Sequence, residues 1–221
     1  MKEQIKSMPV VGLAARSVAR KVRTLRFPGS ADYWERRYAT GGDSGAGSYG
    51  WSAQHKAQVL NGFVREHDIQ SVIEWGCGDG HQLTLAEYPS YIGLDVSDTA
   101  VETCCSMFAG DETKSFYGIR VMCDHARIFH ADLALSLDVT YHLIEEEVFD
   151  TYLRRLFGSA DRFVAIYATD EDHGRIGAHE MRRAFTPWIN QNAPEWHLLK
   201  HVARPEKTNV FESDFYIFER R

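Results

Sequence analysis

Residues 71–83, SVIEWGCGDGHQL, place three glycines at alternate positions, Gly76, Gly78 and Gly80, directly after a short apolar run. The apolar run predicts a buried strand, and the glycines predict a tight turn that something approaches very closely. This G-x-G-x-G spacing differs from a P-loop, which ends in Gly-Lys-Ser/Thr, and from the G-x-G-x-x-G dinucleotide fingerprint. We therefore expect a strand-turn unit that binds a ligand other than a nucleoside triphosphate or a dinucleotide; the alternative is a tight strand-to-helix turn without a ligand.

The chain around this turn has 221 residues, enough for one well-packed domain, with 44% hydrophobic and 25% charged residues. No window approaches ~20 uninterrupted apolar residues, so no membrane-spanning helix is predicted. The four cysteines lack a C-x-x-C spacing, which disfavours a zinc site and favours reduced thiols. We expect a cytoplasmic protein without a signal peptide.

Charge divides the chain unevenly. Residues 1–30 hold seven Lys and Arg side chains against Glu3 alone, a net charge of +6, which leaves −12 of the total −6 on residues 31–221. An acidic body predicts no nucleic-acid partner. In the basic arm, apolar residues recur at helical spacing, so it could lie on the inner face of an anionic membrane or pack on the domain with its charges in water. We divide the chain into this arm, 1–30, and a domain, 31–221.

The rest of the sequence alternates between patterns typical of strands and helices. Strands are expected at 71–74, 91–94, 114–117, 131–137 and 162–168, with two terminal strands at 195–203 and 213–220 that can pair antiparallel. Helices are expected at 52–67 with Ser52 as N-cap, and at 81–86, 100–108, 144–158 and 178–191, the last with a kink at Pro187. This alternation predicts an α/β fold with a mainly parallel sheet and helices on both faces.

Acidic side chains near the glycines indicate the charge of the ligand. Glu74 precedes Gly76 and Asp79 precedes Gly80, and both would repel a pyrophosphate but attract an ammonium or sulfonium group. Asp95 follows the second predicted strand, where a carboxylate can accept both ribose hydroxyls. The ligand implied is a nucleoside with a cationic tail, and S-adenosylmethionine fits that description.

Three stretches, VIEWGCGDG, YIGLDVS and ADLALSLDVTYHL, resemble successive motifs of the class I S-adenosylmethionine-dependent methyltransferases. YWERRYATGGDSGAGSYG and HEMRRAFTPWI resemble a bacterial group linked to surface-glycan biosynthesis, and the resemblance covers roughly residues 30–221. It implies a Rossmann-like seven-stranded sheet that ends in an antiparallel hairpin. It further implies that the residues of the turn wrap the methionine part and those after the second strand hold the ribose: Glu74, Gly76, Cys77, Gly78 and Gly80, then Asp95 and Val96. For the adenine, the one candidate is Asp124.

A second glycine-rich stretch, TGGDSGAGSYG at residues 40–50, is flanked by aromatic residues. It is either a lid that folds over the cofactor and excludes water, or an ordinary loop, and we favour the lid. Tyr33 or Tyr49 would then contact the cofactor.

The segment after the fourth strand, SLDVTYHL, carries the candidate catalytic residues. His142 is the preferred general base because imidazole titrates near neutral pH, Asp138 could orient it or bind acceptor hydroxyls, and Tyr141 lies beside them. A purely structural histidine is the alternative. Asp138, Asp170, Asp172 and His173 could instead hold Mg²⁺, but acidic surface loops are common and we expect no metal.

The predicted helix at 178–191 brings His179, Arg182 and Arg183 onto one face, where they could bind a phosphate or carboxylate of the acceptor. Surface charge pairing is the alternative. We expect an O-methyltransferase acting on a sugar hydroxyl of a bacterial glycan or its precursor. The alternatives are an N- or O-methyltransferase of a small metabolite and a catalytically inert cofactor-binding partner. The lack of an Asn/Asp-Pro-Pro-Tyr motif disfavours amino-group methylation of bases or glutamine.

Overall fold

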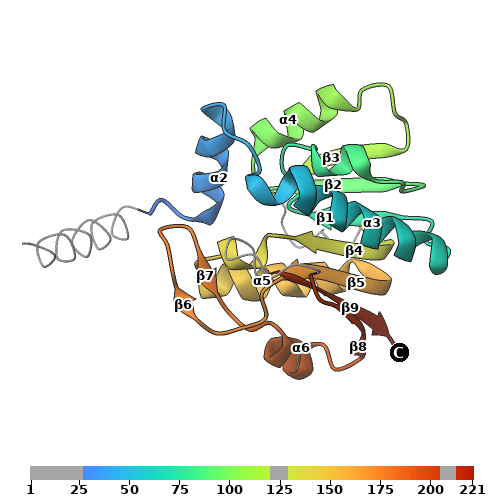
Figure 1. Ribbon diagram of the computed structural model, residues 1–221. Helices are drawn as coiled ribbons and strands as arrows, with labels where there is room; N and C mark the ends of the chain where they lie inside the picture. Colours follow the sequence, from blue (N-terminus) through green and yellow to red (C-terminus); the bar gives the residue numbers. More distant parts are fainter. Residues whose placement is uncertain (1–26, 120–128, 205–212) are drawn as a thin grey trace, which may run out of the picture.

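A computed structural model describes residues 27–119, 129–204 and 213–221. The central sheet has seven strands in the order β3-β2-β1-β4-β5-β9-β8 (Figure 1). Their bounds are Val72–Trp75 (β1), Tyr91–Asp95 (β2), Lys114–Gly118 (β3), Ala131–Leu137 (β4), Ala160–Ala168 (β5), Trp196–Val202 (β8) and Asp214–Arg220 (β9). Strands β1 to β5 run parallel, whereas β9 is antiparallel to both β5 and β8. This confirms the predicted Rossmann-like sheet with its C-terminal antiparallel pair.

The strand order reverses beside β1, which pairs with β2 on one side and β4 on the other. Glu74 on β1 faces Gly93 of β2 and Leu135 of β4 in register. The carboxyl ends of these three strands therefore open into one crevice, where open α/β sheets bind their ligands.

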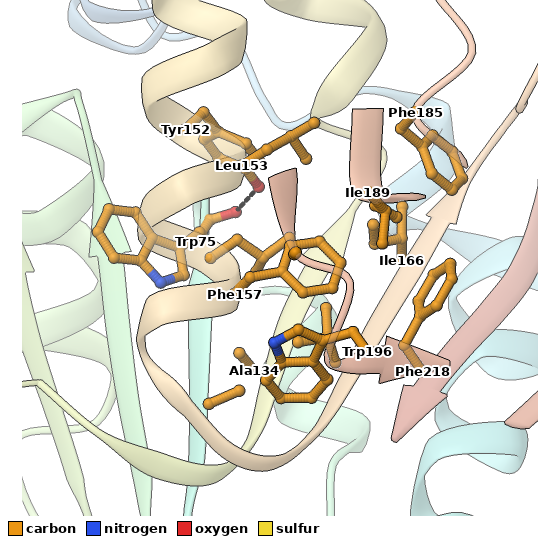
Figure 2. Close-up of a cluster of buried hydrophobic side chains, with 14 of the residues drawn as sticks. Trp75, Ala134, Tyr152, Leu153, Phe157, Ile166, Phe185, Ile189, Trp196 and Phe218 are labelled. Carbon is orange, nitrogen blue, oxygen red and sulfur yellow. Dashed lines mark hydrogen bonds between the residues drawn. The ribbon is translucent and has the colours of Figure 1, made fainter. Parts of the chain in front are cut away.

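Helices cover both faces of the sheet, with bounds Ser30–Ala39 (α2), Gly50–Glu66 (α3), Asp98–Met107 (α4), Glu146–Gly158 (α5) and Thr186–Asn192 (α6). Apolar residues of α5 and α6 pack on one face and those of α3 on the other. In Figure 2 the Tyr152 hydroxyl of α5 donates to the Trp75 carbonyl at 2.8 Å. The Trp75 indole N–H donates to Ser159 Oγ at 2.9 Å, so the end of β1 is held rigidly beneath the crevice.

Three of the expected helices differ in the structure. α3 begins at Gly50 and not at Ser52, whose side chain is buried, and its N-cap Tyr49 makes no side-chain capping bond. Residues 81–86 form only a short 3₁₀ turn, Gln82–Leu85, because the chain leaves for β2 within a few residues.

The third difference lies in residues 178–191, which are not one kinked helix. A small hairpin of β6 (Gly174–Arg175) and β7 (Met181–Arg182) comes first, and α6 starts only at Thr186. Pro187 stands in the first turn of α6, where its missing N–H costs no hydrogen bond. Asp170 accepts from the backbone N–H groups of Phe185 and Thr186 and thereby fixes this helix start.

Ser30 is buried and begins α2. The predicted amphipathic helix of the basic arm lies outside the described residues and stays a prediction, as does its membrane contact. Within the described part of the chain, no helix has the length and apolar character needed to cross a membrane.

Candidate active site

The glycine turn is shaped by close neighbours from the protein itself. Gly78 has φ +60°, and a Cβ at this position would lie 2.3 Å from Ser44 Oγ and 3.0 Å from Tyr38 Oη. At Gly76, with φ +90°, a Cβ would lie 2.6 Å from Val139 Cγ2. Loops from three parts of the chain therefore meet at the turn, and only glycine fits both the backbone conformation and the space.

Asp95 ends β2 with its carboxylate inside the crevice. One oxygen accepts the Gly78 N–H at 2.9 Å, and the other accepts the Ser97 N–H at 2.9 Å. Burial raises the pKa of Asp95 to about 6, against these two backbone hydrogen bonds, which lower it. The carboxylate is thus fixed beside the glycine turn.

A cavity of about 330 Å³ lies over this turn, large enough for a cofactor. It is lined by the ends of β1, β2 and β4, by α3 and by the start of α2. Six of the predicted cofactor residues line it: Glu74, Gly76, Cys77, Gly78, Asp95 and Val96. Gly80 and Tyr33 are not among its lining residues. A Cβ on Gly80 would contact Cys104 and Phe108 instead, and Asp124 lies outside the described residues.

The lining of this first cavity is acidic. Among the described residues that line it, one is a lysine, Lys56, and five carry carboxylates: Asp32, Glu74, Asp95, Asp138 and Glu145. Burial raises the pKa of Glu74 to about 7, although its carboxylate accepts the Tyr91 hydroxyl at 2.6 Å. An excess of carboxylates suits a cationic ligand and opposes a diphosphate.

Residues 40–50 are tied to the glycine turn through Asp79. Its carboxylate accepts the Ser44 N–H and the Tyr49 hydroxyl, both at 2.8 Å, while its own N–H donates to Ser44 Oγ at 2.9 Å. Asp79 was expected to face the ligand, but it joins these two loops and is absent from the described cavity lining. Ser44 and Ser48 line the cavity, so the loop forms part of its wall.

Helix α2 closes the same cavity from another side. Ser30 donates through its N–H at 3.0 Å and its hydroxyl at 2.6 Å to the Glu145 carboxylate. At the other end, Glu35 accepts the hydroxyls of Ser97 and Thr99, both at 2.7 Å. The helix is therefore anchored on both sides of the crevice.

A second cavity of about 230 Å³ adjoins the first. The two share the lining residues Trp34, Ser44, Asp138 and His142, so these side chains mark the boundary between them. The second cavity is also lined by polar and charged side chains from α2, the 3₁₀ turn after β4 and the β6–β7 hairpin: Arg37, Tyr141, His179, Glu180 and Arg182.

The structure therefore brings His179 and Arg182 to this cavity from a hairpin, not from the expected helix face. Arg183 is not part of the described lining. Its guanidinium donates to the carbonyls of Leu143 and Ile144 at 2.8 and 2.6 Å and lies over the Phe149 ring. It supports the loop that leads into α5.

His142 is held in one tautomer. Its Nδ1 lies 2.9 Å from the His179 carbonyl oxygen, which can only accept, so Nδ1 carries the proton and Nε2 keeps its lone pair. Burial lowers the pKa of His142 to about 4, so the ring is neutral at pH 7 but is a weaker base than the imidazole titrating near neutral pH that we expected. The rings of His142 and His179 stack at 5.5 Å, and Tyr33 stacks on His179 at 4.5 Å, which is where the structure places Tyr33.

Asp138 and Tyr141 lie together at the boundary of the cavities. Asp138 has a φ of +60°, unusual for a residue with a side chain, and its Oδ1 accepts the Tyr141 hydroxyl at 2.9 Å. Its Oδ2 lies 2.7 Å from Lys56 Nζ. We did not predict Lys56, although its position three residues after Ala53 and four before Leu60 places it on the buried face of α3.

The acids proposed as an alternative Mg²⁺ site have other partners. Asp170 binds the start of α6, and Asp172 accepts the Ala184 N–H at 3.0 Å. Within the described ranges, no group of three or more His, Cys, Asp or Glu side chains is placed to hold a metal ion.

No family model and no curated protein matches the chain in sequence. Solved structures do match it in fold. The N-methyltransferase NodS from Bradyrhizobium japonicum WM9, in complex with S-adenosyl-L-homocysteine, has a TM-score of 0.66 at 15% identity over 86% of this chain and 98% of its own. This chain has the class I methyltransferase fold.

Two further structures agree. Magnesium protoporphyrin IX methyltransferase (ChlM) from Synechocystis PCC 6803, with bound S-adenosylhomocysteine, has a TM-score of 0.60 at 16% identity over 93% of this chain and 100% of its own. The methyltransferase domain of bacterial CtHen1 has a TM-score of 0.61 at 17% identity over 76% of this chain and 97% of its own. One of these proteins is named for its acceptor, magnesium protoporphyrin IX, and another is named as an N-methyltransferase, so the shared fold leaves the acceptor of this chain open.

Proposed function

We propose that the protein is an S-adenosylmethionine-dependent methyltransferase whose acceptor binds in the second cavity. The observation that carries this proposal is the pair of adjoining cavities: an acidic, cofactor-sized one over the glycine turn and a polar one that shares Asp138 and His142 with it. A methyl donor in the first cavity and an acceptor in the second would meet at that boundary.

The residues present fit S-adenosylmethionine. Asp95 offers a carboxylate for the ribose hydroxyls, and Gly76 and Gly78 line the cavity beside it, where the methionine part would lie. Gln82 lines the cavity, and its buried Oε1 has no hydrogen-bond partner among the described residues, so it can accept from the ammonium group of the cofactor. When bound, this cofactor supplies a methyl group on a positively charged sulfur. An acceptor would attack the methyl group in line and displace the sulfur as a neutral thioether.

The side chains at the boundary would prepare the acceptor. His142 Nε2 accepts the proton of an acceptor hydroxyl, because its ring is neutral and its Nδ1 proton is held by His179. Asp138 accepts a hydrogen bond from a neighbouring donor of the acceptor. Trp34 and the 40–50 loop cover both cavities and exclude water, which would compete for the methyl group.

We propose a sugar hydroxyl of a bacterial glycan or its precursor as the acceptor. The polar lining supports a polyhydroxyl compound, and Arg182 and His179 would favour one with a carboxylate or phosphate. A small-metabolite amine is the second candidate, since a neutral amine attacks the methyl group through its own lone pair and His142 Nε2 can accept a hydrogen bond from its N–H. A catalytically inert cofactor-binding protein would bind the cofactor but methylate nothing.

Calorimetry on the purified apo protein tests the cofactor. S-Adenosylmethionine and S-adenosylhomocysteine should both bind saturably, and Asp95→Ala should weaken both by about 100-fold, because it removes charged hydrogen bonds to two hydroxyls. Asp161→Ala, at an exposed carboxylate, is the matched control. No binding by the folded wild-type protein would refute the proposal.

Acceptor screening with labelled methyl donor then separates the candidates. Label in sugars supports the glycan precursor, label in amines the second candidate, and His142→Ala should slow either reaction at least 100-fold. Binding of the cofactor without label transfer to any acceptor, and indifference to His142→Ala, would favour the inert protein.

A further inference from the structure

Lys56 is the buried charge that the proposed mechanism leaves without a role. Its side chain is only 1% exposed, because Lys56 stands on the buried face of α3. Burying an ammonium group is costly unless a carboxylate compensates it, so the position is one where charge matters.

The compensating group is Asp138, which is itself held by several contacts. Lys56 Nζ lies 2.7 Å from Oδ2, the Tyr141 hydroxyl donates to Oδ1, and the Asp138 backbone is left-handed at φ +60°. A Cβ on Gly47 would lie 2.7 Å from the same Oδ2, so the covering loop packs directly on this ion pair. The pair is therefore built into the boundary between the cavities.

The charge of this boundary matters for the proposed reaction, because methyl transfer converts a sulfonium cation into a neutral thioether. The lining holds five carboxylates, and Lys56 is the single basic residue that opposes them among the described lining residues. Without it, the acidic cavity would favour the cationic cofactor over its neutral product more strongly, through simple Coulomb attraction.

We propose that Lys56 is a positioning residue that balances Asp138 at this boundary and thereby sets the preference of the site for S-adenosylmethionine over S-adenosylhomocysteine. The inference rests on the proposed function. Lys56 holds the Asp138 carboxylate at the wall that the two cavities share and offsets its negative charge. Asp138 then orients the acceptor without binding the sulfonium group too tightly.

Calorimetry with the two cofactors tests this without an acceptor. At an effective dielectric of about 20, removing one unit charge from the wall of a cavity of this size changes the affinity for a cation bound in it by about tenfold. Lys56→Met should therefore shift the ratio of the two dissociation constants about tenfold toward S-adenosylmethionine, and Asp138→Asn about tenfold the other way. Lys56→Arg should keep the wild-type ratio, as should Lys200→Met, a control at an exposed lysine.

The double variant Lys56→Met/Asp138→Asn keeps the test valid if the single variants fold poorly, because it leaves no unpaired buried charge. Its ratio should return to within about threefold of the wild-type ratio. Equal weakening of both cofactors with an unchanged ratio would overturn the proposal. The proposal would also be overturned if Lys56→Met weakened the binding of both cofactors but not of methylthioadenosine, which lacks the cofactor carboxylate. Lys56 would then bind that carboxylate. Failure of the wild-type protein to bind either cofactor would refute the proposed function as well.

Discussion

Replacement of Gly78 by alanine should destabilise the protein by about 3 kcal/mol. The left-handed backbone costs a residue with a Cβ about 1–2 kcal/mol. The new methyl group would also displace Ser44 Oγ, 2.3 Å away, which accepts the Asp79 N–H and bonds to the Tyr38 hydroxyl. Each lost hydrogen bond adds about 1 kcal/mol. For a chain of this length, the total corresponds to a melting temperature lower by roughly 6–12 °C.

Urea denaturation followed by tryptophan fluorescence measures this cost. Gly62→Ala is the control, because nothing lies within 4 Å of its Cβ position in α3 and alanine there should be neutral or stabilising. In a Ser44→Ala background the nearest obstacle is gone and Tyr38 Oη, at 3.0 Å, has only to shift slightly, so Gly78→Ala should cost mainly the backbone part, about 1–2 kcal/mol. An equal cost in both backgrounds would refute the reasoning that Ser44 is what requires glycine.

Three further predictions concern single side chains. The pKa of Glu74 is raised to about 7, so the folded protein binds this proton more tightly than the unfolded chain does. The stability contributed by this group therefore falls as pH rises from about 4.5 to 7. Glu74→Gln should flatten that part of a urea-derived stability profile. An unchanged slope would contradict the assignment. Arg183→Met should lower the unfolding free energy by about 2 kcal/mol, because two carbonyls lose a charged donor, and leave S-adenosylhomocysteine affinity unchanged; full stability with a raised KM for the acceptor would instead show substrate binding. Asp79→Ala should speed proteolytic cleavage within residues 40–50 several-fold relative to Asp161→Ala, and equal cleavage rates would show that Asp79 does not hold the loop.

Much of the sheet could be predicted because its signals are local. Each strand is a short apolar run bounded by polar residues, and the predicted bounds of 131–137 agree with those of β4. The approximate spans of α4 and α5 were also predicted. The prediction of one helix at residues 178–191 was wrong. Their apolar residues fit a helical spacing, but Asp170 fixes the helix start at Thr186 through contacts made across the chain. A pattern within the segment carries no information on such a partner.

The candidate site, like the fold, could be predicted only in part. Motif spacing predicted the place of Asp95, because the last residue of β2 must lie at the carboxyl end of the sheet once parallel strands form. Spacing also suggested that Asp79 faces the ligand, whereas its carboxylate binds Ser44 and Tyr49. Which way a side chain of a tight turn points depends on the loop that packs against it.

By itself, the sequence determined the succession of the seven strands of the main sheet, the glycine turn and the acids beside it, since these follow from short-range periodicity and from steric limits on single residues. Only the tertiary structure decided which distant groups meet: Lys56 with Asp138, and the His142 ring with the His179 carbonyl. The reason is physical. Whether a charge is buried, and whether an imidazole stays neutral, depend on desolvation and on partners that the folded chain alone brings within hydrogen-bond distance.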